Sequence, residues 1–227
     1  MSEDKLDFSG VLASTIHDMK NSLGMVLNSL DGIVDKEAGK CACTPEQVAQ
    51  LQYEARRVND NLIQLLTLYK VEKRQYVENI TEQSVADFLE ECYLLNKPLL
   101  EHKGLPLEIE CDEDLLWFFD RDLMAGVVNN VVNNTLRYTR ERVKVAACKE
   151  DGYLHIRVED DGAGFPERML ESVTHETEID FRKGHTGLGI FFCSQVAALH
   201  ENKGRKGHIA LSNDSELGGG CFSIYLP

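Results

Sequence analysis

Apolar residues recur every three or four positions along two long segments near the N-terminus, residues 8–35 and residues 45–72. The apolar face of the first segment comprises Leu12, Ile16, Met19, Leu23, Val26, Leu27 and Leu30, and that of the second comprises Val48, Leu51, Ala55, Val58, Leu62, Leu65, Leu66 and Tyr69. This spacing predicts two amphipathic helices. The segment 36–44 is the expected turn, and Pro45 suits the first position of the second helix. Because one helical hairpin buries little apolar surface, we expect a homodimeric four-helix bundle.

A polar link over residues 72–82 separates this hairpin from a segment with a mixed pattern. Helices are predicted at 85–100, 122–138 and 188–199, and strands at 105–110, 115–119, 143–147, 153–159, 208–212 and 221–226. Helices combined with a mostly antiparallel sheet predict an α/β sandwich and place the chain in the α+β class. We therefore expect two domains, a helical hairpin at 1–73 and the sandwich at 84–227.

Two asparagines and a pair of glycines predict a phosphate site in the second domain. Asn130 and Asn134 are four residues apart, so their side chains lie on one face of the predicted helix. Two amides in line can hold a hydrated Mg²⁺ ion and phosphate oxygens without adding negative charge. Gly187 and Gly189 open the last predicted helix, whose free N–H groups and positive dipole end favour phosphate.

A third piece, Asp160 with Gly162 and Gly164, has features suited to the base of a nucleotide. The carboxylate follows an apolar strand and can accept a hydrogen bond from an exocyclic amine, while the glycines let the backbone approach a flat ring. Together the three pieces predict an ATP site. In this order they resemble the Bergerat-type ATPase family, which includes histidine kinases and type II topoisomerases.

The first predicted helix carries a second motif, His17-Asp18 followed by Lys20 and Asn21. His17 lies beside the apolar seam, where a phosphoryl donor can reach its ring. This motif, upstream of an ATP site, resembles the phosphoacceptor box of sensor histidine kinases. The resemblance covers nearly the whole chain. It implies that His17 takes the γ-phosphoryl group, that Asp18 orients the imidazole and accepts its proton, and that Asn21 positions water for dephosphorylation of a partner. Lys20 either steadies phosphate charge or is solvated.

The same resemblance implies roles in the ATP site. Asn134 holds Mg²⁺, and Asn130 supports the ion or contacts phosphate. Arg137 reaches phosphate, and Tyr138 packs either along the nucleotide or in the core. The remaining cofactor-binding positions are Asp160 on the adenine amino group, Gly162 and Gly164 beneath the ring, and Thr186, Gly187, Leu188 and Gly189 around the phosphates.

The chain departs from the family pattern at several positions. Ser22 stands where the phosphoacceptor box often has proline, Thr135 where alanine usually follows the second asparagine, and His185 where the glycine motif often has glycine. The segment between Gly164 and Gly184 is short for an ATP lid. These departures bear on the catalytic rate and on the lid more than on ATP binding.

The amino-acid composition argues against some classes of binding partner. The formal net charge of −14 argues against binding to nucleic acid or to an anionic membrane surface. No apolar run of transmembrane length and no signal peptide is evident, so we expect a cytoplasmic protein. Seven scattered cysteines fit a reducing compartment. Cys41 and Cys43 are the only close pair, and a redox or metal role for them stays open.

The predicted function is an ATP-dependent histidine autokinase that passes phosphate to an aspartate of a response-regulator receiver domain and also dephosphorylates it. The alternatives are a phosphotransfer or phosphatase scaffold without efficient autokinase activity, and an ATP-driven clamp or serine kinase of the same ATPase family. The short segment before His17 suggests either a stand-alone kinase that receives its signal from a separate sensor protein, or the core of a larger one. The signal, the regulator and the choice between cis and trans phosphorylation are not readable from the sequence.

Overall fold

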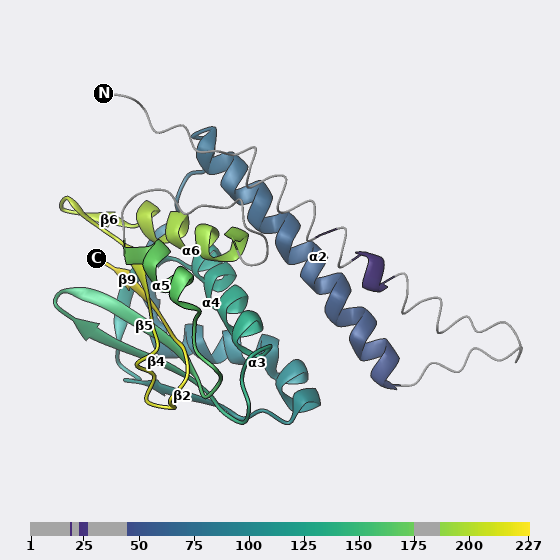
Figure 1. The fold of residues 1–227 in the computed structure, drawn as a ribbon. Coiled ribbons are helices and arrows are strands. Elements are labelled where there is room, and N and C mark those ends of the chain that lie inside the picture. The colour runs from purple at the N-terminus through teal and green to yellow at the C-terminus, as the bar shows by residue number, and fades with distance from the viewer. Residues whose placement is uncertain (1–18, 20–22, 27–44, 175–186) are drawn as a thin grey trace, which may run out of the picture. The chain divides into compact units, whose positions relative to one another are not determined.

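The computed structural model describes residue 19 and residues 23–26, 45–174 and 187–227 (Figure 1). Met19 and residues 23–26 are helical, but most of the first predicted helix and its turn lie outside the described residues. The described residues fall into two compact units, one containing residues 45–76 and the other containing residues 77–174 and 189–227.

The second predicted helix is present with the predicted bounds, as α2 (Pro45–Glu72). Its C-terminal half carries large apolar side chains that are open to solvent in this single chain. Their exposed fractions are 43% for Leu62, 53% for Ile63, 56% for Leu66 and 43% for Tyr69. None of the described helices combines the length and apolar content that a membrane span requires.

The second unit combines helices with a mixed sheet, as predicted from the α+β pattern. The helices are α3 (Val85–Lys103), α4 (Arg121–Thr135), α5 (Glu167–Thr174) and α6 (Gly187–Leu199), of which the first two residues belong to the other unit. The strands are β1 (Ile80–Ser84), β2 (Leu107–Cys111), β3 (Leu116–Asp120), β4 (Val143–Glu150), β5 (Tyr153–Asp160), β6 (Glu201–Asn202), β7 (Arg205–Lys206), β8 (His208–Ser212) and β9 (Cys221–Leu226). Five of them form one sheet in the order β2-β4-β5-β9-β8, in which only β2 and β4 run parallel.

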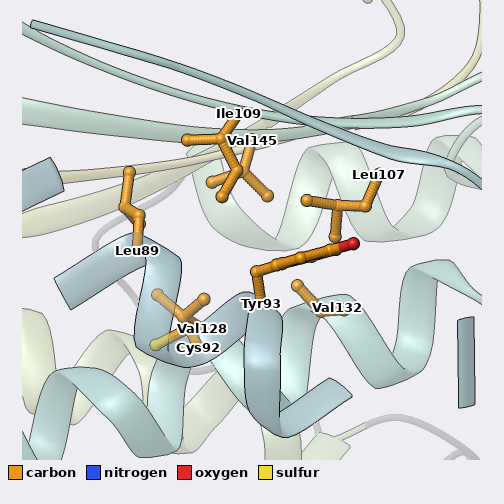
Figure 2. Close-up of a pocket in the computed structure, with 8 residues that line it drawn as sticks. All are labelled: Leu89, Cys92, Tyr93, Leu107, Ile109, Val128, Val132 and Val145. Atoms are coloured by element: carbon orange, nitrogen blue, oxygen red, sulfur yellow. The ribbon is translucent and has the colours of Figure 1, made fainter. Parts of the chain in front are cut away.

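Strand alternation places one face of this sheet in the core. In β5 the side chains of Leu154, Ile156 and Val158 are buried against the helices, as are those of Phe222 and Ile224 in β9. Figure 2 shows helices α3 and α4 directing apolar side chains toward β2 and β4. The residues drawn are Leu89, Cys92, Tyr93, Leu107, Ile109, Val128, Val132 and Val145. The space between them is about 10 Å³, room for one water at most, so this part of the core is closed.

Several elements differ from the prediction, including the two-residue strands β6 and β7, which were not predicted. Residues 80–84, of which the first three were expected in the polar link, form strand β1, which pairs antiparallel with β3 over Ile80–Ser84. The asparagine-bearing helix ends at Thr135 instead of Tyr138, and beyond it the N–H groups of Arg137 and Tyr138 bond to carbonyls three residues back instead of four. The segment expected as a lid begins with the short helix α5, at Glu167–Thr174.

Candidate functional site

The two predicted phosphate-site amides lie together on α4. Asp120 caps the N-terminus of this helix, and its Oδ1 accepts a hydrogen bond from the Leu123 N–H at 3.0 Å. Asn130 and Asn134 are both half-buried, and Asn134 Nδ2 donates to Asn130 Oδ1 at 3.4 Å. The pair is therefore stacked one turn apart, and within the described residues Asn134 Oδ1 has no hydrogen-bond donor. We call this pair, together with Gly189, the asparagine end of the site.

Helix α6 approaches Asn130 closely because position 189 is glycine. A Cβ at Gly189 would lie 2.7 Å from both Nδ2 and Oδ1 of Asn130. One turn further along α6, Cys193 Sγ accepts a hydrogen bond from Asn130 Nδ2 at 3.5 Å. Burial raises the pKa of the Cys193 thiol to about 12, so the sulfur is protonated at neutral pH. The Asn130 amide is thus oriented by α6 from one side and by Asn134 from the other.

A buried histidine ties the far end of α6 to the start of α4. His200 is 2% exposed, and its Nε2 accepts a hydrogen bond from the Asp120 N–H at 3.0 Å. Its Nδ1 donates to the Val196 carbonyl at 2.8 Å. Because Nε2 accepts a hydrogen bond, the ring must be neutral. Burial lowers the pKa of His200, while the hydrogen bond to Val196 opposes the shift. The two helices of the asparagine end are therefore joined at both ends of their contact.

The predicted base-binding carboxylate, Asp160, ends strand β5 and is 7% exposed. Its Oδ1 accepts hydrogen bonds from the backbone N–H of Gly162 at 2.7 Å and of Gly220 at 3.3 Å. Within the described residues, no donor is directed at Oδ2. The carboxylate is thus held through one oxygen, and the other is available to an outside N–H group.

Glycines line this carboxylate on two loops. A Cβ at Gly162 would lie 2.5 Å from the Tyr138 carbonyl oxygen, and one at Gly219 would lie 2.5 Å from both the Asp160 carbonyl oxygen and the Gly162 nitrogen. A Cβ at Gly220 would lie 3.0 Å from the Phe165 ring and 3.2 Å from Asp160 Oδ2. We call Asp160 with these glycines and Gly164 the aspartate end of the site.

Gly219 and Gly220, which lie between the last two predicted strands, were not among the predicted site residues. Their run of three glycines was visible, but only the pairing of β5 with β9, which sets Glu159 opposite Cys221, brings them against Asp160. Residues just beyond α4 join the two ends of the site, because the Tyr138 carbonyl lies against Gly162. The structure thus brings the asparagine helix and the Asp160 loop together.

The neighbouring Asp161 fixes the path of the chain after α4. Its carboxylate accepts hydrogen bonds from the backbone N–H groups of Arg140 at 2.9 Å and Glu141 at 3.0 Å. Burial acts to raise the pKa of Asp161, but the backbone N–H groups outweigh it and hold that pKa below its ordinary value. The loop after α4 is therefore fastened to the loop after β5 by a charged acceptor.

The other predicted site residues are placed as follows. Arg137 and Tyr138 are exposed, with Tyr138 at 60%, so the core alternative for Tyr138 is wrong. Gly187 and Leu188 open α6. His17, Asp18, Asn21 and Thr186 lie outside the described residues, as do Cys41 and Cys43. The described part of the chain contains no group of three or more His, Cys, Asp or Glu side chains that could hold a metal ion.

Comparison with known proteins agrees with this geometry. Residues 119–227 match the family described as histidine kinase-, DNA gyrase B-, and HSP90-like ATPase. The chain is similar to the sensor protein SrrB of Staphylococcus aureus strain N315, with 25% identity over 231 residues that cover 98% of this chain. The chain spans 38% of the length of that curated relative.

Solved histidine kinases share the fold. The histidine kinase AdeS of Acinetobacter baumannii has a TM-score of 0.65 at 20% identity, covering 92% of this chain and 96% of that one. The histidine kinase ThkA, in its complex with the response regulator protein TrrA, has a TM-score of 0.63 at 19% identity, covering 95% of this chain and 60% of that one. The match of residues 119–227 to this ATPase family, together with the similarity of the chain to a sensor protein in sequence and to histidine kinases in fold, supports a histidine-kinase ATPase core.

Proposed function

We propose that this chain, which carries a histidine-kinase ATPase core, is an ATP-dependent protein-histidine autokinase of a two-component system. In this proposal it phosphorylates its own His17 and transfers the phosphoryl group to an aspartate of a response-regulator receiver domain. It also dephosphorylates that regulator, with Asn21 positioning water. The observation that carries the proposal is the joint placement of the stacked Asn130–Asn134 pair and the half-satisfied Asp160 carboxylate.

Asp160 supports adenine as the base. With Oδ1 occupied by two backbone N–H groups, Oδ2 is left to accept a hydrogen bond from an exocyclic amine. Guanine presents a carbonyl oxygen at the corresponding ring position, and that oxygen facing a carboxylate is unfavourable because both are acceptors. Gly162 and Gly164 allow the close packing of the loop after Asp160, because a Cβ at either position would lie within 2.6 Å of the Tyr138 carbonyl oxygen or of Asn213 Oδ1.

The asparagine end fits a magnesium ion that arrives with the nucleotide. Mg²⁺ prefers oxygen ligands and keeps few protein contacts in phosphate sites, where substrate phosphates and waters complete its shell. Asn134 Oδ1 accepts no hydrogen bond from the described residues, and Asn130 is held beside it. When bound, the ion supplies charge neutralisation at the phosphates. The chain's own contribution is to orient the donor toward His17 and to let Asp18 receive the imidazole proton.

Two further features belong to the proposal. The exposed apolar side chains Leu62, Leu66 and Tyr69 recur along one side of α2, which supports a homodimer packed through this helix. Residues 1–73 then form the dimerisation and phosphoacceptor domain, and 84–227 the catalytic domain. The input signal reaches the chain through a separate sensor protein or a further segment, and we place the protein in the cytoplasm.

The test is to incubate the full chain with Mg²⁺ and ATP radiolabelled on the γ-phosphate, beside a His17→Gln variant. Label that requires His17, is lost in acid and survives base is phosphohistidine and supports the autokinase. Nucleotide binding without label would favour the phosphotransfer or phosphatase scaffold. Label that is independent of His17 would overturn the assignment of the phosphoacceptor.

A further inference from the structure

An exposed asparagine outside the predicted site clamps the loop that follows Asp160. Asn213 comes directly after strand β8, and its Oδ1 accepts a hydrogen bond from the Phe165 N–H at 2.6 Å. Its Nδ2 donates to the Phe165 carbonyl at 3.0 Å. The side-chain amide therefore pairs with both backbone groups of one residue, as a neighbouring strand would.

The loop is shaped to receive this amide. Gly164 has a φ of +77°, and a Cβ there would lie 2.6 Å from Asn213 Oδ1. Any other residue at 164 would be strained by its backbone conformation and would push the amide away. Gly164 is thus needed for the approach of Asn213, a role different from the predicted one beneath the nucleotide ring.

The segment that begins at Asn213 is fastened to β5 at two further points. Ser215 Oγ donates to the Asp160 carbonyl at 3.0 Å. The Glu216 N–H donates at 2.9 Å to Oε2 of Glu159, whose side chain is 1% exposed and also pairs with Arg157 at 3.4 Å. Beyond these anchors, Gly219 and Gly220 reach the Asp160 carboxylate.

These contacts close a ring around the base-binding carboxylate. Asn213 holds the loop that follows Asp160. Ser215 and Glu159 connect the segment after Asn213 to strand β5, and the Gly220 N–H donates to Asp160 itself. We propose that Asn213 is a positioning residue for the nucleotide base, acting through Phe165 and Gly164, and that Glu159 is the buried anchor of the same segment. This inference rests on the proposed ATP site and deepens it.

The expected consequence concerns base recognition more than phosphoryl transfer. Asn213 makes no contact with Asn130 or Asn134 among the described residues, so the asparagine end stays in place without it. Loss of two hydrogen bonds that hold the loop weakens base binding by about fivefold to tenfold. Discrimination between adenine and guanine falls with it, because the orientation of Asp160 Oδ2 becomes less defined.

The experiment measures ADP and GDP affinity in the presence of Mg²⁺ by calorimetry, using the full chain. The variants are Asn213→Ala, which removes both hydrogen bonds, and Asn213→Asp, which keeps the acceptor for the Phe165 N–H but places an oxygen against the Phe165 carbonyl. Asn202→Ala is the matched control, since Asn202 is an exposed asparagine on β6. Thermal unfolding of each variant is recorded in parallel.

We expect Asn213→Ala to lose about fivefold to tenfold in ADP affinity and to lower the ratio of ADP to GDP affinity, with Asn213→Asp intermediate and Asn202→Ala unchanged. ADP affinity within twofold of wild type in Asn213→Ala overturns the inference. An equal loss for both nucleotides, together with a lower unfolding temperature, assigns Asn213 a purely structural role and overturns it as well. If wild type and Asn202→Ala also fail to bind ADP, the proposed ATP site itself is wrong.

Discussion

The aspartate end of the candidate site is formed mainly by backbone groups, and the asparagine end mainly by side chains. At the aspartate end the surroundings of the carboxylate are mostly backbone. Main-chain N–H groups hold Asp160, and a Cβ added at Gly162 or Gly219 would lie 2.5 Å from backbone atoms. At the asparagine end the surroundings are side chains. Asn130 is hydrogen-bonded to Asn134 and Cys193, and its amide occupies the position that a Cβ at Gly189 would need. Backbone cannot rearrange without unfolding locally, whereas an amide can rotate. The aspartate end is therefore suited to selecting a base, and the asparagine end to following phosphates as they react.

The largest expected effect is at the asparagine end. We expect Asn134→Ala to lower the rate of Mg²⁺- and ATP-dependent labelling by about 100-fold or more, because the amide oxygen positioned for the ion is lost. Asn133→Ala is the matched control, since Asn133 is the preceding residue and points about 100° away around α4. Initial rates of labelling in the full chain measure the difference.

Unchanged labelling in Asn134→Ala would contradict the assignment. A comparable loss in Asn133→Ala would mean that the helix, and not the amide, had been damaged.

At the aspartate end, substitution should affect folding. A Cβ at Gly219 would lie 2.5 Å from two backbone atoms, so we expect Gly219→Ala to lower the free energy of unfolding by about 2 kcal/mol or more. Gly218→Ala is the control: its φ of +88° is unfavourable for alanine, but no atom lies within 4 Å, so about 1 kcal/mol is expected. Denaturant unfolding of both variants measures the contrast. Equal losses would show that the backbone wall is not close-packed.

In contrast to Gly219→Ala, Gly189→Ala should reduce labelling without reducing stability. The obstacle at position 189 is the Asn130 amide, which can rotate away, and alanine favours helix by about 1 kcal/mol over glycine. We therefore expect unchanged or higher stability, with labelling reduced about tenfold because Asn130 is displaced. Labelling rates and unfolding midpoints, measured on the same sample, test this prediction. A variant that is destabilised as strongly as Gly219→Ala would remove the distinction between the two ends.

The smallest expected effect is the change in stability with pH, which should come from His200 and not from Asp161. The pKa of His200 is lowered in the folded protein, so below about pH 6.5 the unfolded chain binds a proton that the native state excludes. Stability from this histidine is therefore complete above that pH and is lost as pH falls toward the folded pKa. The Asp161 anchor, whose pKa is held low, keeps its charge over the same interval.

Unfolding midpoints at pH 7.5 and 5.5 for wild type and His200→Gln test this. The variant should show a smaller decrease between the two pH values than wild type. An identical decrease would assign the pH dependence to other groups, such as His155, whose pKa burial also lowers.

Local patterns were sufficient to predict most elements and the core of the site. Helical spacing placed Asn130 and Asn134 on one face, and an apolar strand followed by glycines placed Asp160 at a strand end, as the structure shows. Strand β1 was missed because its central residues, Thr81, Glu82 and Gln83, are polar, and its pairing with β3 depends on residues more than thirty positions away.

The rest of the aspartate end depends on contacts that are distant in sequence. Phe165 and Asn213 are separated by 48 positions, and Asp160 and Gly220 by 60. No periodicity in a single chain signals such pairs, because they arise from the order of strands in the sheet. The roles of His17, Asp18, Asn21 and Thr186 stay predictions from the sequence.

The Cys193 thiol, which accepts a hydrogen bond from Asn130, bears on the design of inhibitors. A cysteine one hydrogen bond away from a nucleotide site is an attractive target for an electrophilic warhead. Cys193 is fully buried, however, and its pKa of about 12 leaves almost no thiolate to react at neutral pH. Of the five cysteines in the described residues, the exposed Cys148 is the most accessible to an electrophile. Selective compounds for this site would therefore need to gain affinity through reversible contacts with Asp160 and its glycines, and covalent labelling patterns would report on the opposite surface of the sheet.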